Sequence, residues 1–129
     1  MSEIEKMYDN VGIKTCKRKQ GFTLKDCTDR DCKECGYYIM PPFTPEKQIE
    51  LIKTIETKCD FVDCIQIVFR PMEDLWKISI IPVLEMAFEE IHLYFGCNKD
   101  FSTALAMAIN NLWQDLTEEE KQQVKGILE

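Results

Sequence analysis

Histidine is almost missing from this sequence, which holds a single one, His92, in 129 residues. A cysteine nucleophile that relies on a histidine base would therefore have to pair His92 with a thiol such as that of Cys64 or Cys97. The chain also contains neither a phosphate-cradling P-loop nor a G-x-G-x-x-G turn. Because these absences leave catalysis without a motif, we expect a protein that is not an enzyme.

Long apolar runs and an excess of basic residues are missing as well. No stretch approaches the ~18 apolar residues of a membrane-spanning helix, so we expect no membrane partner. The first residues, MSEIEKMYDN, are acidic and polar and do not resemble a secretory signal, which predicts a cytosolic location. The net charge of −7 opposes the basic stripe typical of nucleic-acid-binding proteins, although a few local cations could hold a small anion.

Helix start signals occur at four places along the chain, which contains no internal repeat. The expected caps are Ser2 with Glu5 three residues later, Thr44 followed by Pro45, Asp100 or Ser102, and Thr117 with Glu120. Residues 104–113 are apolar nearly all round, which is typical of a buried helix.

The middle of the chain is strand-like. DCIQIVF and LWKISII are rich in β-branched residues, and the turn segment RPMED lies between them, which predicts an antiparallel hairpin. IHLYF indicates a further strand, VLEMAFEE weakly indicates another, and Gly96, Asn98 and Asp100 are interpreted as a turn. The sum predicts one α+β domain over residues 1–129, with a small antiparallel sheet covered by helices as an alpha-beta-alpha sandwich.

Four of the seven cysteines lie in the segment CKRKQGFTLKDCTDRDCKECG, which we interpret as a Cys-rich loop inserted at about residues 14–36. The odd number of cysteines and the expected cytosolic location argue against full disulfide pairing. The possible zinc ligands are Cys16, Cys27, Cys32 and Cys35, of which the last two have the C-x2-C spacing of a zinc knuckle. Because the first two are not closely spaced, the alternative is a surface loop of reduced cysteines without a cofactor. The simplest interpretation of Cys59, Cys64 and Cys97 is that they are small hydrophobic residues.

The helix that begins near Phe101 is a candidate anion site, because free N–H groups and a positive dipole end can hold a phosphate. Asn98, Ser102 and Thr103 would add polar contacts there, but an ordinary capped helix has the same residues, so both interpretations stay open. Arg70, the only arginine after residue 30, is either a surface ion pair or a phosphate ligand. Strand aromatics, Phe88 among them, could stack on a base or fill the core.

Several segments together resemble a known family. MPPFTPEKQIELIKTIETK, LWKISI and FSTALAMAINNLW are similar to the phage ABA-sandwich domain. MSEIEKMYDN, DCTDRDCKECGYYI and NNLWQDLTEEEKQQVKGILE resemble more closely one group with this domain, the Thoeris anti-defence protein 1 family. The resemblance covers residues 1–56 and 101–129 well and residues 57–100 poorly.

The resemblance implies a phage-encoded sponge, acting in the cytoplasm of the infected bacterial host. Such proteins bind cyclic ADP-ribose isomers made by TIR-domain enzymes, and some bind other cyclic nucleotides, without cleaving them, so that Thoeris immune signalling stays off. Family members form dimers or larger assemblies with ligands between protomers, and the resemblance implies a dimer or a higher oligomer, up to a hexamer, here. The expected ligand contacts are Phe101, Ser102 and Thr103 in the matching segment, Arg70, Phe88 and Asn98 in the poorly matched middle, and Arg18 and Gln20 for a second pocket.

Two alternatives from other classes remain at this point. The first is a zinc-stabilised adaptor that inhibits a host protein by direct binding, which the Cys-rich loop would support. The second is a small nuclease or phosphodiesterase, which would depend on His92. The three functions differ in whether the protein retains intact nucleotide, zinc or neither.

Overall fold

A computed structural model describes residues 2–13, 31–32, 37–38, 42–83 and 93–129. Its helices are α1 (Glu3–Asn10), α2 (Pro45–Lys58), α3 (Phe101–Leu112), the 3-10 helix η3 (Trp113–Asp115) and α4 (Glu118–Leu128). Its strands are β1 (Asp31–Cys32), β2 (Tyr37–Tyr38), β3 (Val62–Arg70), β4 (Leu75–Pro82) and β5 (Tyr94–Asn98). None of the helices described is long and apolar enough to cross a membrane.

The helices begin where the sequence predicts, because each cap side chain accepts a hydrogen bond from an N–H of the first turn. Ser2 caps α1 and Thr44 caps α2, with Pro45 in the first turn of α2. Thr117 and Glu120 form a reciprocal capping box at α4. Of the two candidates for α3, Asp100 is the cap: its carboxylate accepts the Thr103 N–H at 3.0 Å.

The three long strands form an antiparallel sheet in the order β3-β4-β5. β3 and β4 make the predicted hairpin, in which Arg70 lies opposite Leu75 and Phe69 lies opposite Trp76. The prediction for the last strand was wrong in its position. β5 runs over Tyr94–Asn98, so Gly96 and Asn98 belong to a strand and not to the turn that their residue types indicated.

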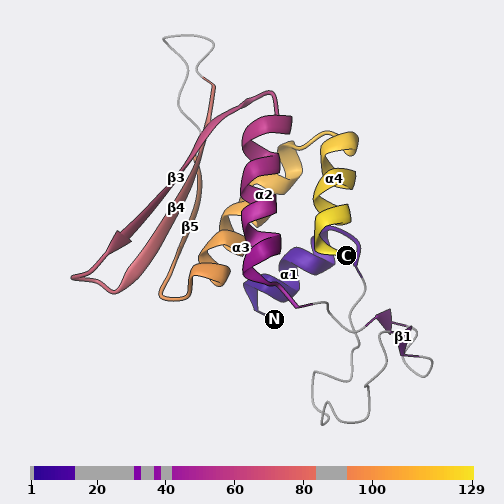
Figure 1. The fold of residues 1–129 in the computed structure, drawn as a ribbon, viewed down its shortest axis with the longest axis horizontal. Coiled ribbons are helices and arrows are strands. Elements are labelled where there is room, and N and C mark those ends of the chain that lie inside the picture. The colour runs from indigo at the N-terminus through magenta and orange to yellow at the C-terminus, as the bar shows by residue number, and fades with distance from the viewer. Residues whose placement is uncertain (1, 14–30, 33–36, 39–41, 84–92) are drawn as a thin grey trace.

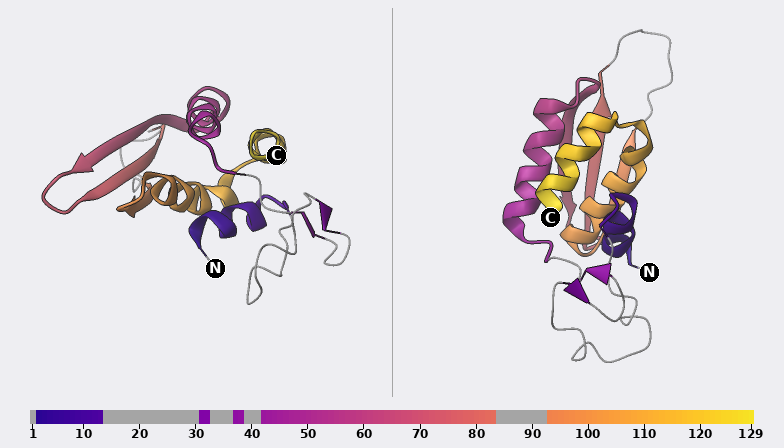
Figure 2. Two further views of the ribbon diagram at one scale, coloured as in Figure 1. Left: turned by 60° about the horizontal axis from the view of Figure 1, so that its bottom comes forward. Right: turned by 90° about the vertical axis from the view of Figure 1, so that its right-hand side faces the viewer.

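The helices that the structure describes all lie on one side of this sheet (Figure 1). Seen from that side, they stand in front of the strands (Figure 2, right). This arrangement confirms the predicted α+β class with a small antiparallel sheet covered by helices. The described residues form two layers, the sheet and the helices that cover one of its faces. The other face of the sheet carries no helix from this part of the chain.

The core lies between the sheet and the helices, and α3 is its central element. Its buried members come from every layer and include Tyr8, Leu51, Ile78, Leu105 and Val124. α3 approaches β5 so closely that a Cβ built on Gly96 would lie 1.7 Å from the Ala104 carbonyl oxygen. Glycine is therefore needed in this strand for packing against a helix and not for a turn.

Tyr8 has a buried hydroxyl without a hydrogen-bond partner among the residues that the structure describes. Burial removes solvent from this phenol and raises its pKa to about 12. A buried hydroxyl without a partner lowers the stability of the protein. The Tyr8 ring packs edge-on against Phe43, and a phenylalanine at position 8 would keep this contact. We expect Tyr8→Phe to raise the free energy of unfolding by about 1 kcal/mol, measured by urea denaturation. A loss of stability would mean that this hydroxyl has a partner.

Candidate functional site

The two faces of the sheet differ because successive strand residues point in opposite directions. In β5, Tyr94 and Gly96 are buried toward the helices, whereas Phe95 and Cys97 are exposed. The cross-strand register then assigns the neighbouring residues to the same two faces. We call the face without helices the open face. Its residues in regular pairing are Cys64, Gln66, Val68 and Arg70 of β3, Leu75, Lys77, Ser79 and Ile81 of β4, and Phe95 and Cys97 of β5.

The open face contains cations and an aromatic ring but no carboxylate among these strand residues. This composition stands out in a chain with a net charge of −7. Lys77 places its Nζ 4.9 Å from the centre of the Phe95 ring, which is within the range of a cation–π contact. Phe95 is nevertheless 40% exposed, so the ring retains an accessible surface.

Arg70, which the sequence predicts as a ligand contact, lies at the end of this face beside the hairpin turn. Its guanidinium is 3.9 Å from the Glu73 carboxylate, and both side chains are about half exposed (52% and 54%). An exposed pair at this distance contributes little to stability. Arg70 is therefore free of a strong structural role, and its charge is accessible to a ligand.

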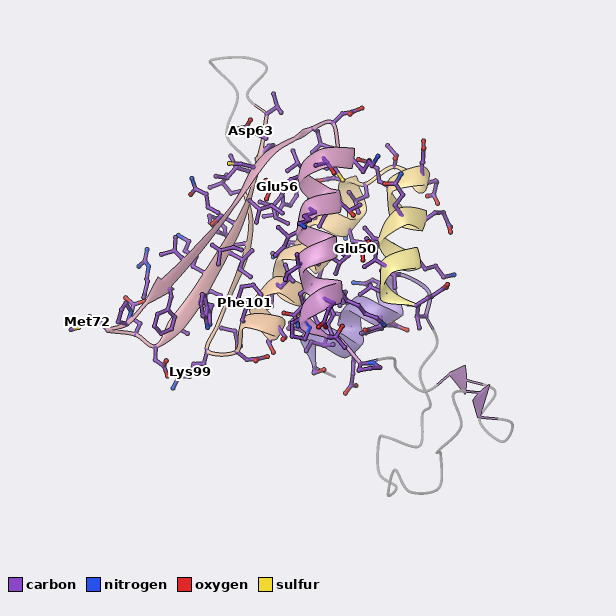
Figure 3. The ribbon with its side chains drawn as sticks, viewed as in Figure 1. Glu50, Glu56, Asp63, Met72, Lys99 and Phe101 are labelled. Atoms are coloured by element: carbon purple, nitrogen blue, oxygen red, sulfur yellow. The ribbon has the colours of Figure 1, made fainter. Side chains whose placement is uncertain are left out.

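The other predicted contacts that the structure describes lie on the helix side. Asn98 is opposite Trp76 in the sheet. Phe101 packs edge-on against Trp76, with ring centres 5.2 Å apart, and Phe69 contacts the same indole at 4.9 Å. Phe101 lies near the end of the sheet where α3 begins (Figure 3). These aromatic side chains close that end of the core, so Arg70 and Phe101 share one end of the sheet but not one face.

The start of α3 resembles an ordinary capped helix more than an anion site. The Asp100 carboxylate accepts hydrogen bonds from both the backbone N–H and the hydroxyl of Thr103, at 3.0 and 2.7 Å. The Ser102 hydroxyl accepts a bond from the buried Gln48 amide at 2.8 Å. Asn98 accepts the Asp100 N–H at 2.9 Å. A phosphate placed here would meet the Asp100 charge, which disfavours this part of the predicted site.

The remaining predicted contacts lie outside the described residues: Phe88, Arg18, Gln20, Cys16, Cys27 and Cys35, together with the side chain of Cys32. Zinc binding by the Cys-rich loop thus stays a prediction. The side chains that are described form no group of three or more potential metal ligands.

The described cysteines differ in their surroundings. Cys59 is buried, as predicted for a small hydrophobic residue, and desolvation together with a hydrogen bond to Glu120 raises its pKa to about 12. Desolvation alone would raise the pKa of Glu120, but hydrogen bonds from Thr117 and Cys59 outweigh it and lower this pKa. Cys97 is exposed on the open face, because it points away from α3.

Sequence reasoning did not single out Lys77 as a candidate contact. Strand alternation places Lys77 on the same face as Arg70, and the pairing of β4 with β5 brings it beside Phe95 and Cys97. The hairpin pattern alone would have located Lys77 relative to Arg70. The contact with Phe95 depends on the position of β5, which the sequence did not predict correctly.

Comparisons with known proteins provide no further assignment: no family model, curated protein or solved structure matches this chain. The open face is thus defined by its own geometry and chemistry. Such a surface can hold an anion with a flat ring, because Arg70 and Lys77 offer charge-assisted hydrogen bonds and Phe95 offers a stacking surface.

Proposed function

We propose that this protein binds a small cyclic nucleotide, of the class of cyclic ADP-ribose isomers, and sequesters it without cleavage. In the cytoplasm of an infected bacterial host, this would deprive a Thoeris effector of its signal. The observation that carries the ligand class is the open face, on which Arg70, Lys77 and Phe95 gather without a carboxylate in an acidic protein. The resemblance to the Thoeris anti-defence protein 1 family supports the particular ligand.

The spacing of the open face suits a ligand with two phosphates and a purine. Arg70 lies opposite Leu75, Lys77 follows two residues along β4, and Phe95 lies opposite Ser79. Because side chains on one face of a strand repeat about every 7 Å, one ligand can contact both cations. The phosphates would bind Arg70 and Lys77, and the purine would pack against Phe95.

Sequestration requires affinity and slow release but no catalytic step. Self-association, which the resemblance implies, would help because a ligand between two copies is more fully buried than one on a single sheet face. The proposal therefore includes a homo-oligomer of at least two chains. It includes no membrane or nucleic-acid partner.

The proposal is tested by calorimetric titration of the reduced protein with glycocyclic ADP-ribose, followed by denaturation and mass analysis of the released ligand. We expect saturable binding and quantitative recovery of the intact cyclic molecule. Linear ADP-ribose is the control, and we expect it to bind at least tenfold more weakly because its open form is more flexible. Recovery of a cleaved product would make the protein an enzyme, and the absence of binding would exclude the proposed function.

A further inference from the structure

β3 is an edge strand, and its outer side has no partner among the residues that the structure describes. It is nine residues long, and its segment Cys64–Phe69 contains neither a charge nor a proline. Ile67, Val68 and Phe69 are 42%, 46% and 41% exposed, so the edge is apolar on both faces of the sheet. Edge strands of monomeric proteins are usually protected by charges, prolines or short length, and the middle of β3 has none of these protections.

We propose that a second copy of this chain covers this edge, and that the two β3 strands pair antiparallel about a two-fold axis at Ile67. The inference rests on the self-association included in the proposed function and assigns a surface to it. A two-fold arrangement is the commonest symmetry of soluble oligomers and uses the same patch on both copies.

The position of the axis follows from a break in the β3–β4 register. The pairing is irregular between Val62 and Cys64, and it is regular from Cys64 to Arg70. The midpoint of the regular segment is Ile67. An axis perpendicular to the sheet keeps both open faces on the same side, so paired residues must share a face. Pairing about Ile67 meets this condition, because it places Gln66 opposite the partner's Val68 and Cys64 opposite the partner's Arg70.

The charges at the two ends of the segment favour the antiparallel direction. Asp63, an exposed residue, precedes the segment at one end, and Arg70 ends it at the other. Asp63 lies at the end of the sheet far from the hairpin tip that carries Met72 (Figure 3). Antiparallel pairing brings each Arg70 to within one strand position of the partner's Asp63, whereas parallel pairing would place the two Arg70 residues together. A second copy therefore complements this edge in charge.

Pairing of this kind would also extend the open face across the two copies. The partner's Arg70 would lie beside Cys64 and on the same face as Gln66 and Phe95. Each ligand surface would then receive a cation from the other chain, which gives the dimer a role in binding.

Substitutions of opposite charge at Ile67 test the pairing in the absence of nucleotide. Native mass spectrometry and sedimentation of the reduced full chain should show a dimer. We expect I67K and I67E each to be monomeric, because like charges would face each other across the axis. An equimolar mixture should restore a dimer that contains one chain of each kind, because lysine then faces glutamate. Met72→Lys, at the 98% exposed hairpin tip, is the matched control and should remain dimeric.

A monomeric unmodified protein would overturn the inference, and so would an I67K dimer or a mixture that stays monomeric. Amide hydrogen exchange of the unmodified chain gives a measurement that does not depend on the folding of the variants. Protection of residues 64–69 should rise at least tenfold between monomeric and dimeric concentrations, and unchanged protection would contradict the pairing. A dimer that binds no nucleotide would refute only the sequestration of a nucleotide. Nucleotide binding by a strictly monomeric chain would refute this inference and the self-association, and would leave the sequestration standing.

Discussion

Gly96→Ala is expected to destabilise the fold strongly. The added Cβ would lie 1.7 Å from the Ala104 carbonyl oxygen and 2.8 Å from the Ala108 nitrogen. Both are backbone atoms of α3, so the clash cannot be relieved by rotating a side chain. α3 and β5 would have to move apart, which would open the core around Ala104 and Ala108. Overpacking of a core typically costs about 1–3 kcal/mol, and we expect about 3 kcal/mol or more here because backbone atoms are involved. Thermal unfolding followed by circular dichroism measures the effect.

Gly126→Ala is the matched control, because it adds the same methyl group where nothing lies within 4 Å. Gly126 lies in α4, and replacing an exposed helical glycine by alanine stabilises by about 0.5–1 kcal/mol. The same substitution should therefore have opposite signs at the two positions. A Gly96→Ala protein as stable as the unmodified chain would show that α3 does not contact β5 at this glycine.

Removing the cations of the open face is expected to have the largest effect on ligand binding. Charge-assisted hydrogen bonds contribute about 1.5–3 kcal/mol each, so Arg70→Ala or Lys77→Ala should weaken nucleotide affinity about tenfold or more. The double variant should lose about a hundredfold. Stability should change little, because Arg70 is exposed and its contact with Glu73 is long. Titration calorimetry of each folded variant measures the affinity.

Lys53→Ala is the matched control for these variants, since it removes one positive charge from an exposed position in α2. Its affinity should stay within about twofold of the unmodified protein if only charges on the open face bind the ligand. A uniform loss of affinity in all three single variants would indicate a general electrostatic effect. Unchanged affinity in the double variant would remove Arg70 and Lys77 from the site.

The hairpin and the helix starts could be predicted because their causes are local in the sequence. Period-two patterns on both sides of RPMED define β3 and β4, and cap side chains bond to N–H groups three residues away. The position of β5 could not be predicted, because Gly96 has the residue type of a turn but is required by α3. Of the candidate site, the sequence predicted Arg70 and, in general terms, an aromatic strand residue that stacks on a base.

The sequence by itself determined the helix caps, the antiparallel hairpin, the α+β class and the acidic charge, since each depends on residue type and short spacing. Tertiary structure decided which face each predicted contact occupies. Arg70 and Lys77 share the open face with Phe95, whereas Asn98, Phe101 and Thr103 belong to the helix side. The physical reason is that a strand residue's face depends on its register with neighbours far along the chain, and a register exists only once the strands have paired.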